Sequence, residues 1–150
     1  MNGIEIERKF LVKGDFKHLA TEKVTILQGY LSTTHGRTVR VRLNGDSAFI
    51  TIKGATDRNG FSREEYEYRI PKKDAAEILK LCSGTIEKER YFVPEGRHVF
   101  EVDVFHGQHE NLVIAELELQ SEDELFDQPE WLGKEVTGKI QYYNSWLSEH

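Results

Sequence analysis

The sequence predicts an α+β fold in which roughly eight antiparallel strands form a closed or nearly closed β-barrel, with a few short helices beside it. Three features favour this fold. Eight segments alternate between two kinds of residue with the two-residue period of a strand. Glycine-containing turn signals separate several of these segments, and Asn44-Gly45 is the strongest hairpin signal among them. Apolar residues with helical spacing occur only in short stretches.

The first four predicted strands are Ile4–Val12, Thr25–Ser32, Thr38–Leu43 and Ala48–Lys53. The other four are Ser62–Ile70, Thr85–Val93, His98–Phe105 and Leu112–Leu119. Besides Asn44-Gly45, turns are expected at His35-Gly36, Asn59-Gly60, Pro94-Glu95-Gly96 and Gly107–Asn111.

Four short helices are expected: Asp15–Lys23, Asp74–Cys82, Ser121–Phe126 and Ile140–Ser148. The second has Ala75, Ile78, Leu79 and Cys82 on one apolar stripe. The third begins with Ser121 and Glu124 in the spacing of a capping box. The fourth places Tyr142 over Trp146 and Tyr143 over Leu147.

Composition limits the class of protein. A chain of 150 residues fits one domain, residues 1–150, and 38% hydrophobic residues is too many for a disordered chain. The net charge of −6 argues against non-specific nucleic-acid binding. A single cysteine, Cys82, excludes an internal disulfide bond and suits a reducing compartment. No signal peptide and no long apolar run is present, so we expect a cytoplasmic protein without a membrane segment.

Charged residues make up 31% of the chain, and they follow the strand period. Within a strand they share one face, and apolar residues take the other. The rows are Glu5, Glu7 and Lys9; Arg40 and Arg42; Lys53 with Thr51; Arg63, Glu65, Glu67 and Arg69; Lys88 and Arg90; Glu101 and Asp103; and Glu116 and Glu118.

A solvated outer face is the ordinary explanation for such a row. Two features favour a charged interior instead. The rows contain few neutral polar residues, and their signs are sorted, with acids on the first, seventh and eighth strands and bases on the third, fourth and sixth. A ligand with both cationic and anionic parts explains the sorting. A complex of Mg²⁺ or Mn²⁺ with a triphosphate is such a ligand, since carboxylates bind the metal and Arg and Lys bind phosphate oxygens.

If the charged face lies inside, the apolar face lies outside and only part of it is covered by helices. We therefore expect a homodimer that forms through exposed apolar strands.

The segment Glu5-Ile6-Glu7-Arg8-Lys9 resembles the N-terminal E-x-E-x-K signature of the CYTH superfamily, the triphosphate tunnel metalloenzymes. The resemblance extends over nearly the whole chain. It continues through Gln28–Leu31, Arg40–Arg42, Thr51–Lys53, Ser62–Glu67, Glu87–Tyr91, Phe100–Phe105, Ala115–Glu118 and Glu135–Gly138. One departure follows Gly138, where relatives often have an acidic residue and then Arg-Tyr, whereas this chain has Lys139-Ile140-Gln141-Tyr142.

The resemblance implies an eight-stranded antiparallel tunnel that binds triphosphates with a divalent metal, Mg²⁺ or Mn²⁺. By position, the metal ligands would be Glu5, Glu7, Asp103, Glu116 and Glu118. The phosphate-binding residues would be Lys9, Arg40, Arg42, Lys53, Lys88 and Arg90. Catalysis is expected to involve Glu5, Lys88 and Asp103, with Glu5 and Asp103 helping to hold a second metal that activates water. Glu65 and Glu67 match tunnel acids whose role stays open.

The expected reaction is hydrolysis of inorganic tripolyphosphate, because the compact chain resembles small bacterial members with that activity. A class IV adenylate cyclase, a thiamine triphosphatase and a non-catalytic polyphosphate-binding module are the alternatives. Purely structural roles stay open for two residues. Asp103 could neutralise a neighbouring arginine, and Tyr30 could be a packed aromatic residue rather than a hydrogen-bond partner of Lys88.

Overall fold

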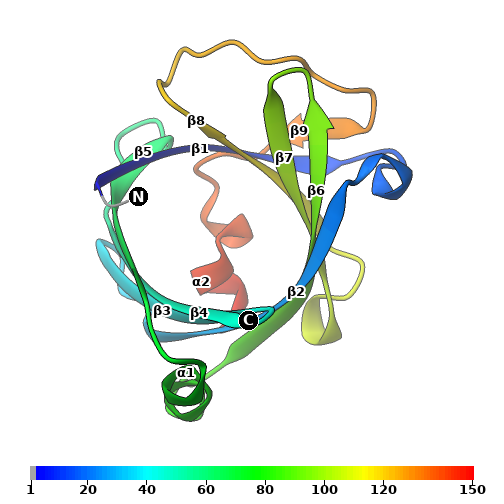
Figure 1. Ribbon diagram of the computed structural model, residues 1–150. Helices are drawn as coiled ribbons and strands as arrows, with labels where there is room; N and C mark the ends of the chain where they lie inside the picture. Colours follow the sequence, from blue (N-terminus) through cyan, green and yellow to red (C-terminus); the bar gives the residue numbers. More distant parts are fainter. Residues whose placement is uncertain (1–2) are drawn as a thin grey trace.

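Eight antiparallel strands close into a ring in the computed structural model, which describes residues 3–150 (Figure 1). The strand order is β5-β4-β3-β2-β6-β7-β8-β1-β9, and pairing of β5 with β1 closes the barrel. The strands are β1 Gly3–Val12, β2 Glu22–Ser32, β3 Arg37–Asn44, β4 Ser47–Gly54, β5 Ser62–Arg69, β6 Thr85–Glu95, β7 His98–Phe105, β8 Val113–Leu119 and β9 Leu132–Glu135. The helical elements are η1 Lys17–Leu19, α1 Lys72–Leu79, η2 Gly107–His109, η3 Ile140–Tyr142 and α2 Asn144–Leu147.

The fold class and all eight predicted strands are confirmed, with differences only at their ends. The Asn44-Gly45 signal forms the predicted hairpin: Asn44 pairs with Ser47, and Gly45 has φ +61°, which glycine adopts without strain. Strand β9 was not predicted. It has only four residues, among them Gly133 and Lys134, and so has no apolar alternation to recognise.

A side-chain cluster on the outside of the barrel fixes β9 against β1. Arg8 donates two hydrogen bonds to the Glu135 carboxylate, at 2.8 and 2.6 Å. The Thr137 hydroxyl accepts from the Lys9 backbone N–H at 2.8 Å and donates to Glu135 at 2.7 Å. The Glu135–Gly138 motif therefore braces the strand that carries Glu5, Glu7 and Lys9.

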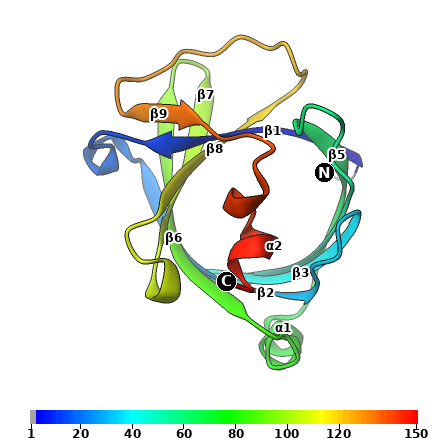
Figure 2. The ribbon, with the colours of Figure 1, turned by 180° about the vertical axis from the view of Figure 1, so that it is seen from behind.

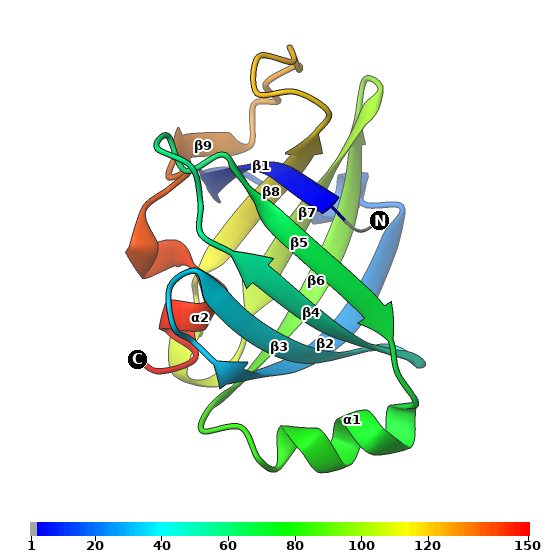
Figure 3. The same ribbon diagram turned by 90° about the vertical axis from the view of Figure 1, so that its left-hand side faces the viewer.

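The helix predicted over Asp74–Cys82 exists as α1, which begins and ends slightly earlier. Its stripe is also confirmed, because buried Ala75 and Leu79 pack with Val41 of β3 on the outer face of the barrel. Figure 3 shows α1 beside β2 and β3, outside the ring.

The other helix predictions need correction. Asp15–Lys23 is not one helix: it contains the turn η1 and the first residues of β2, which pairs with β6 from Glu22 onward. Ser121–Phe126 is irregular: the Ser121 hydroxyl bonds the Asp123 carboxylate instead of capping a helix. Ile140–Ser148 is divided into η3 and α2, because Tyr143 between them has an extended backbone (φ −76°, ψ 137°).

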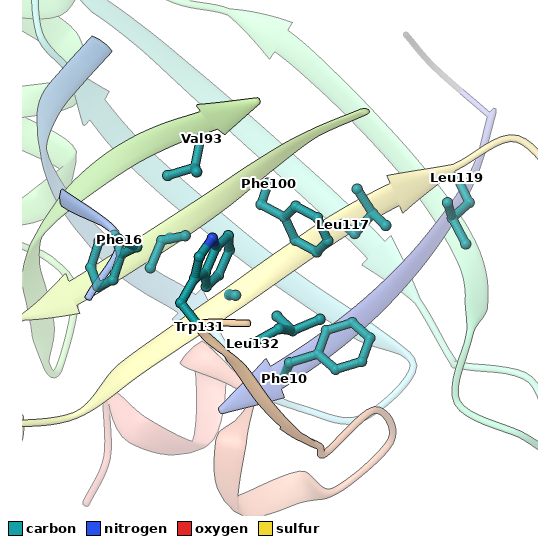
Figure 4. Packing of buried hydrophobic residues seen from close by; sticks show 10 residues of the cluster. Phe10, Phe16, Val93, Phe100, Leu117, Leu119, Trp131 and Leu132 are labelled. Carbon is teal, nitrogen blue, oxygen red and sulfur yellow. The ribbon is translucent and has the colours of Figure 1, made fainter. Parts of the chain in front are cut away.

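The largest apolar cluster lies outside the barrel, between the ring and the segments that cover it (Figure 4). Phe10, Phe100 and Leu117 extend outward from β1, β7 and β8, where Phe16 and Trp131 from the flanking loops cover them. The rings of Phe100 and Trp131 meet edge to face, with centroids 5.3 Å apart. The largest part of the hydrophobic packing is thus on the outer face of the strands. A smaller cluster of Ile86, Phe105, Ile114 and Leu147 lies on the inner face, next to α2.

Within residues 3–150, no helix combines the length and the apolar character required to cross a lipid bilayer.

Candidate functional site

A cavity of about 290 Å³ occupies the interior of the barrel, and all eight ring strands contribute side chains to it. Its described lining contains equal numbers of acidic and basic residues. The acids are Glu5, Glu7, Glu65, Glu67, Glu101, Glu116 and Glu118, and the bases are Lys9, Arg40, Arg42, Lys53, Arg63, Lys88 and Arg90. The charged rows predicted from the sequence therefore face a shared lumen rather than bulk solvent. Arg69, at the end of its row, is an exception: it is exposed and bonds Ser47.

The strongest ion pairs in the lumen join β6 to β7 and β8. Arg90 forms a bidentate pair with Asp103, at 2.8 and 2.9 Å, and also donates to Glu116 at 3.0 Å. The Lys88 ammonium lies 2.7 Å from Asp103 Oδ2, the oxygen that also accepts from Arg90 Nη2. Lys88 and Asp103 are almost completely buried, with side chains 1% exposed. A buried network of this kind is stable only while each charge keeps its partners.

Basic side chains are crowded on one side of the lumen, and the pKa of two of them is lowered there. Burial lowers the pKa of Arg42 to about 9, and the charges of Arg40 and Arg90 act in the same direction. Burial also lowers the pKa of Lys88 to about 7, against the opposing effect of Asp103. The buried Nε of Arg40 has no hydrogen-bond partner among the described residues. An anion held between these cations would relieve their repulsion and supply the missing acceptor.

On the acid-rich side of the lumen, carboxylates are crowded together. Glu7 of β1 lies directly across from Glu118 of β8, and Glu116 is in the same row as Glu118. Burial raises the pKa of Glu7 to about 8, and the charges of Glu116 and Glu5 raise it further. Such a group of carboxylates gains from a bound cation, which offsets their mutual repulsion.

The other lumenal acids are already paired. Glu5 accepts from Lys53 Nζ at 2.9 and 3.2 Å, and Glu116 lies 3.4 Å from Lys9 Nζ. Across residues 3–150, no three His, Cys, Asp or Glu side chains are arranged so that they could hold a metal ion together. A metal bound by Glu5 or Glu116 would therefore have to compete with Lys53 or Lys9.

Asp103 differs in position from the other predicted metal ligands. It does not belong to the described lining of the cavity, and both of its oxygens accept from Arg90 or Lys88. Burial alone would raise the pKa of Asp103, but the charges of Arg90 and Lys88 leave it below the ordinary value. The structure thus places Asp103 behind two cations that face the lumen.

The C-terminal segment supplies lining residues that the sequence did not predict. Figures 1 and 2 both show α2 projecting into the barrel opening, and Figure 3 shows it at one end of the barrel. Tyr143, Asn144 and Ser145 line the cavity. The Tyr143 ring centroid lies 5.3 Å from Lys9 Nζ, and the Lys9 ammonium also donates to the Tyr142 carbonyl at 3.2 Å. Isolated polar residues after the last strand give no periodic signal, so only the fold reveals them.

Tyr30 is buried and lines the same cavity, but Lys88 uses other partners. The described bonds of the Lys88 ammonium go to Asn144 and Asp103.

Comparisons with known proteins agree with this architecture. An inorganic triphosphatase of Acetivibrio thermocellus is 46% identical over 145 residues, which cover 95% of this chain and 92% of that protein. An inorganic triphosphatase of Nitrosomonas europaea is 39% identical over 153 residues, with 96% of each chain covered. A crystal structure of an inorganic triphosphatase superposes with a TM-score of 0.70 at 34% identity and covers 97% of this chain and 95% of that one.

The family model of the CYTH domain matches residues 3–144, a range that includes every strand of the barrel and nearly all of the charged lumen. With this match, and with relatives that are similar over almost their entire length, the chain belongs to the CYTH domain family.

Proposed function

We propose that this chain hydrolyses a terminal phosphoanhydride bond of inorganic triphosphate inside the barrel, with the help of a divalent metal ion. The observation that carries the proposal is the sorting of charge in the lumen, where crowded cations face crowded carboxylates across one cavity. Each group is crowded with like charge, and a metal–triphosphate complex supplies the opposite charge to both. The two relatives named inorganic triphosphatase support the same substrate class.

The bases of the lumen have the task of binding the phosphate chain. We assign this role to Lys9, Arg40, Arg42, Lys53, Lys88 and Arg90, all of which are buried lining residues. Fixed cations orient the chain and stabilise the negative charge that moves onto the leaving phosphate in the transition state. Water attacks the terminal phosphorus, the bond to the bridging oxygen breaks, and orthophosphate and pyrophosphate are the products.

The acids of the lumen fit a hard divalent cation, because Mg²⁺ and Mn²⁺ prefer carboxylate oxygens. We propose that Glu7, Glu116 and Glu118 contribute ligands to the ion, with Glu5 near the reacting water. Because these acids do not form a complete metal site among residues 3–150, phosphate oxygens of the substrate would supply further ligands. A bound ion of this kind would neutralise phosphate charge and lower the pKa of a coordinated water molecule. Asp103 is assigned to the positioning of Lys88 and Arg90 instead of direct metal binding, since both of its oxygens are occupied.

The purified protein is expected to release phosphate from tripolyphosphate in the presence of Mg²⁺ or Mn²⁺, and to lose this activity with a chelator. Assays of ATP and thiamine triphosphate with each metal distinguish the inorganic triphosphatase from the cyclase and thiamine triphosphatase alternatives. Formation of cyclic AMP from ATP would indicate a cyclase, and faster cleavage of thiamine triphosphate would change the substrate. Tight binding of tripolyphosphate without cleavage would leave a binding module and contradict the enzymatic proposal.

We further propose that residues 1–150 act as one domain in the cytoplasm, where the free thiol of Cys82 stays reduced.

A homodimer is proposed through the outer face of β3, β4 and β5. There Val39, Ile52 and Tyr66 are aligned across the three strands by their pairing register. Ile52 and Tyr66 are each 39% exposed, and neighbouring Tyr68 is 52% exposed, so this strip presents large apolar groups to solvent. A second copy related by two-fold symmetry would bury the same strip on both chains.

Sedimentation at micromolar concentration is expected to give a dimer, and Ile52→Glu is expected to give a monomer because it places a charge in the contact. Leu125→Glu, at a 90% exposed residue away from the strip, serves as the control and should stay dimeric. A monomeric parent protein would remove the proposal.

A further inference from the structure

Asn144, the first residue of α2, connects two of the lumenal cations through a chain of hydrogen bonds. Its Oδ1 accepts from Lys88 Nζ at 2.7 Å and from Gln28 Nε2 at 3.0 Å. Gln28 is fully buried, and its Oε1 accepts from Arg42 Nε at 2.9 Å. Arg42, Gln28, Asn144 and Lys88 therefore form one connected unit that spans β3, β2, the C-terminal segment and β6.

The orientation of both amides in this unit is determined by the cations at its ends. Arginine and lysine only donate hydrogen bonds, so each must meet an amide oxygen. Because the Gln28 oxygen accepts from Arg42, the Gln28 NH₂ group points toward Asn144 and donates to Oδ1, the oxygen that also accepts from Lys88. Every hydrogen bond in the unit therefore joins a donor to an acceptor, with both amides oriented as described.

A neutral acceptor at this place has a specific consequence for Lys88. The ammonium has three donors. Asp103 takes one and Asn144 another, which leaves one for a ligand in the cavity. Because the Asn144 amide carries no net charge, it fixes the direction of the ammonium without reducing its attraction for an anion. A carboxylate at this position would fix the same direction and repel a phosphate.

The segment that carries Asn144 is also held by apolar packing and by a contact of its backbone. Leu147 is buried against Ile86, Phe105 and Ile114. Its carbonyl lies 2.7 Å from His109 Nε2. Asn144 is thus held by contacts additional to its own hydrogen bonds with Lys88 and Gln28, which is what a residue that orients other groups requires.

We propose that Asn144 is a positioning residue of the active site: it holds Lys88 directly, and Arg42 through Gln28, in the geometry that binds the phosphate chain. The proposal depends on the triphosphatase function proposed above. It also extends the functional site beyond the barrel strands to the segment that closes one end of the barrel.

The test compares the parent enzyme with Asn144→Ala, Asn144→Asp and the control Ser148→Ala, which removes a hydrogen bond of the same helix outside the lumen. Asn144→Ala is expected to lower kcat/KM for tripolyphosphate about tenfold or more, the scale of one hydrogen bond to a charged group. Asn144→Asp keeps the acceptor and the fold but adds a negative charge, so it should raise KM for the anionic substrate more than it lowers kcat. Ser148→Ala should leave both constants unchanged.

A double-mutant cycle with Gln28→Ala separates positioning from general loosening of the C-terminal segment. If the two amides act as one unit, the loss in Asn144→Ala,Gln28→Ala is smaller than the product of the single losses. Three results would overturn the inference. The losses of kcat/KM from the two substitutions could multiply independently, Asn144→Ala could leave kcat/KM unchanged, or Ser148→Ala could lower kcat/KM as much as Asn144→Ala does.

Calorimetric binding of tripolyphosphate distinguishes failure of this inference from failure of the proposed function. If the parent protein does not hydrolyse triphosphate, the proposed function is wrong, and the positioning role is then judged from affinity alone. Weaker binding by Asn144→Ala than by Ser148→Ala supports the role, and equal binding by the two variants refutes it.

Discussion

Asp103→Ala is expected to destabilise the protein by roughly 3–5 kcal/mol, the usual cost of removing one partner from a buried ion pair. The substitution leaves the buried Arg90 without its bidentate acceptor and the buried Lys88 without its counter-charge. Equilibrium denaturation in urea measures the loss. Asp15→Ala, at a side chain that is 82% exposed, is the matched control and should be nearly neutral.

Two further variants identify the origin of this loss. Asp103→Asn keeps the shape of the side chain and should lose less stability than Asp103→Ala. Replacing Lys88 by Met in the Asp103→Ala background should recover part of the stability, because the buried ammonium that lost its counter-charge is then removed. If the double variant is less stable than Asp103→Ala, the uncompensated charge of Lys88 is not the reason for the loss.

Glu7→Gln is expected to lower kcat for triphosphate hydrolysis by about a hundredfold or more, because it removes a proposed metal ligand from a charge-driven reaction. In the metal-free protein the same change should be stabilising above neutral pH. The folded-state pKa of Glu7, about 8, lies above the ordinary value of 4.5. The ionised form is therefore disfavoured by folding, and stability falls as the pH rises from about 4.5 to 8.

Thermal denaturation between pH 5 and pH 9, together with steady-state kinetics, measures both effects. The pH-dependent decrease should be smaller in Glu7→Gln than in the parent, and smaller in the parent when Mg²⁺ or Mn²⁺ is added. Glu87→Gln, on the exposed face of β6, is the control for loss of one carboxylate. A Glu7→Gln enzyme with normal kcat would contradict the metal-ligand assignment.

The sequence was sufficient to predict the barrel and most of its lumen, because both depend on side-chain alternation within single strands. Arg40 and Arg42 face the same cavity as Glu116 and Glu118 simply because each pair has the parity of its own strand. The position of Asp103 depends instead on the side chains of the neighbouring strands. Asp103 shares a row with Glu101, and Glu101 lines the cavity. Asp103 does not, because it pairs with Lys88 and Arg90, which lie between it and the cavity.

The segments outside the strands were less predictable, since their structure depends on what they cover. Ser121 and Glu124 have the spacing of a capping box, but Phe126 packs on Phe10 and Phe100 while Glu124 pairs with His98. These tertiary contacts outweigh a local preference for one helical turn. The break at Tyr143 likewise places Tyr143 and Asn144 toward the lumen, which an uninterrupted helix over Ile140–Ser148 did not suggest.

The outward placement of Phe10, Phe100 and Leu117 on their strands has a consequence for how such a protein can diversify. Substitutions of cavity-lining residues at inward positions leave the aromatic contacts on the reverse side of the strand intact, so substrate preference can change while the outer core is retained. Asp103, which pairs with buried Lys88 and Arg90, is an inward residue on which stability also depends. Substitutions at outward positions act on the scaffold and leave the inner charge pattern unaltered. Selection for a new reaction and selection for folding therefore operate on alternate residues of the same strands.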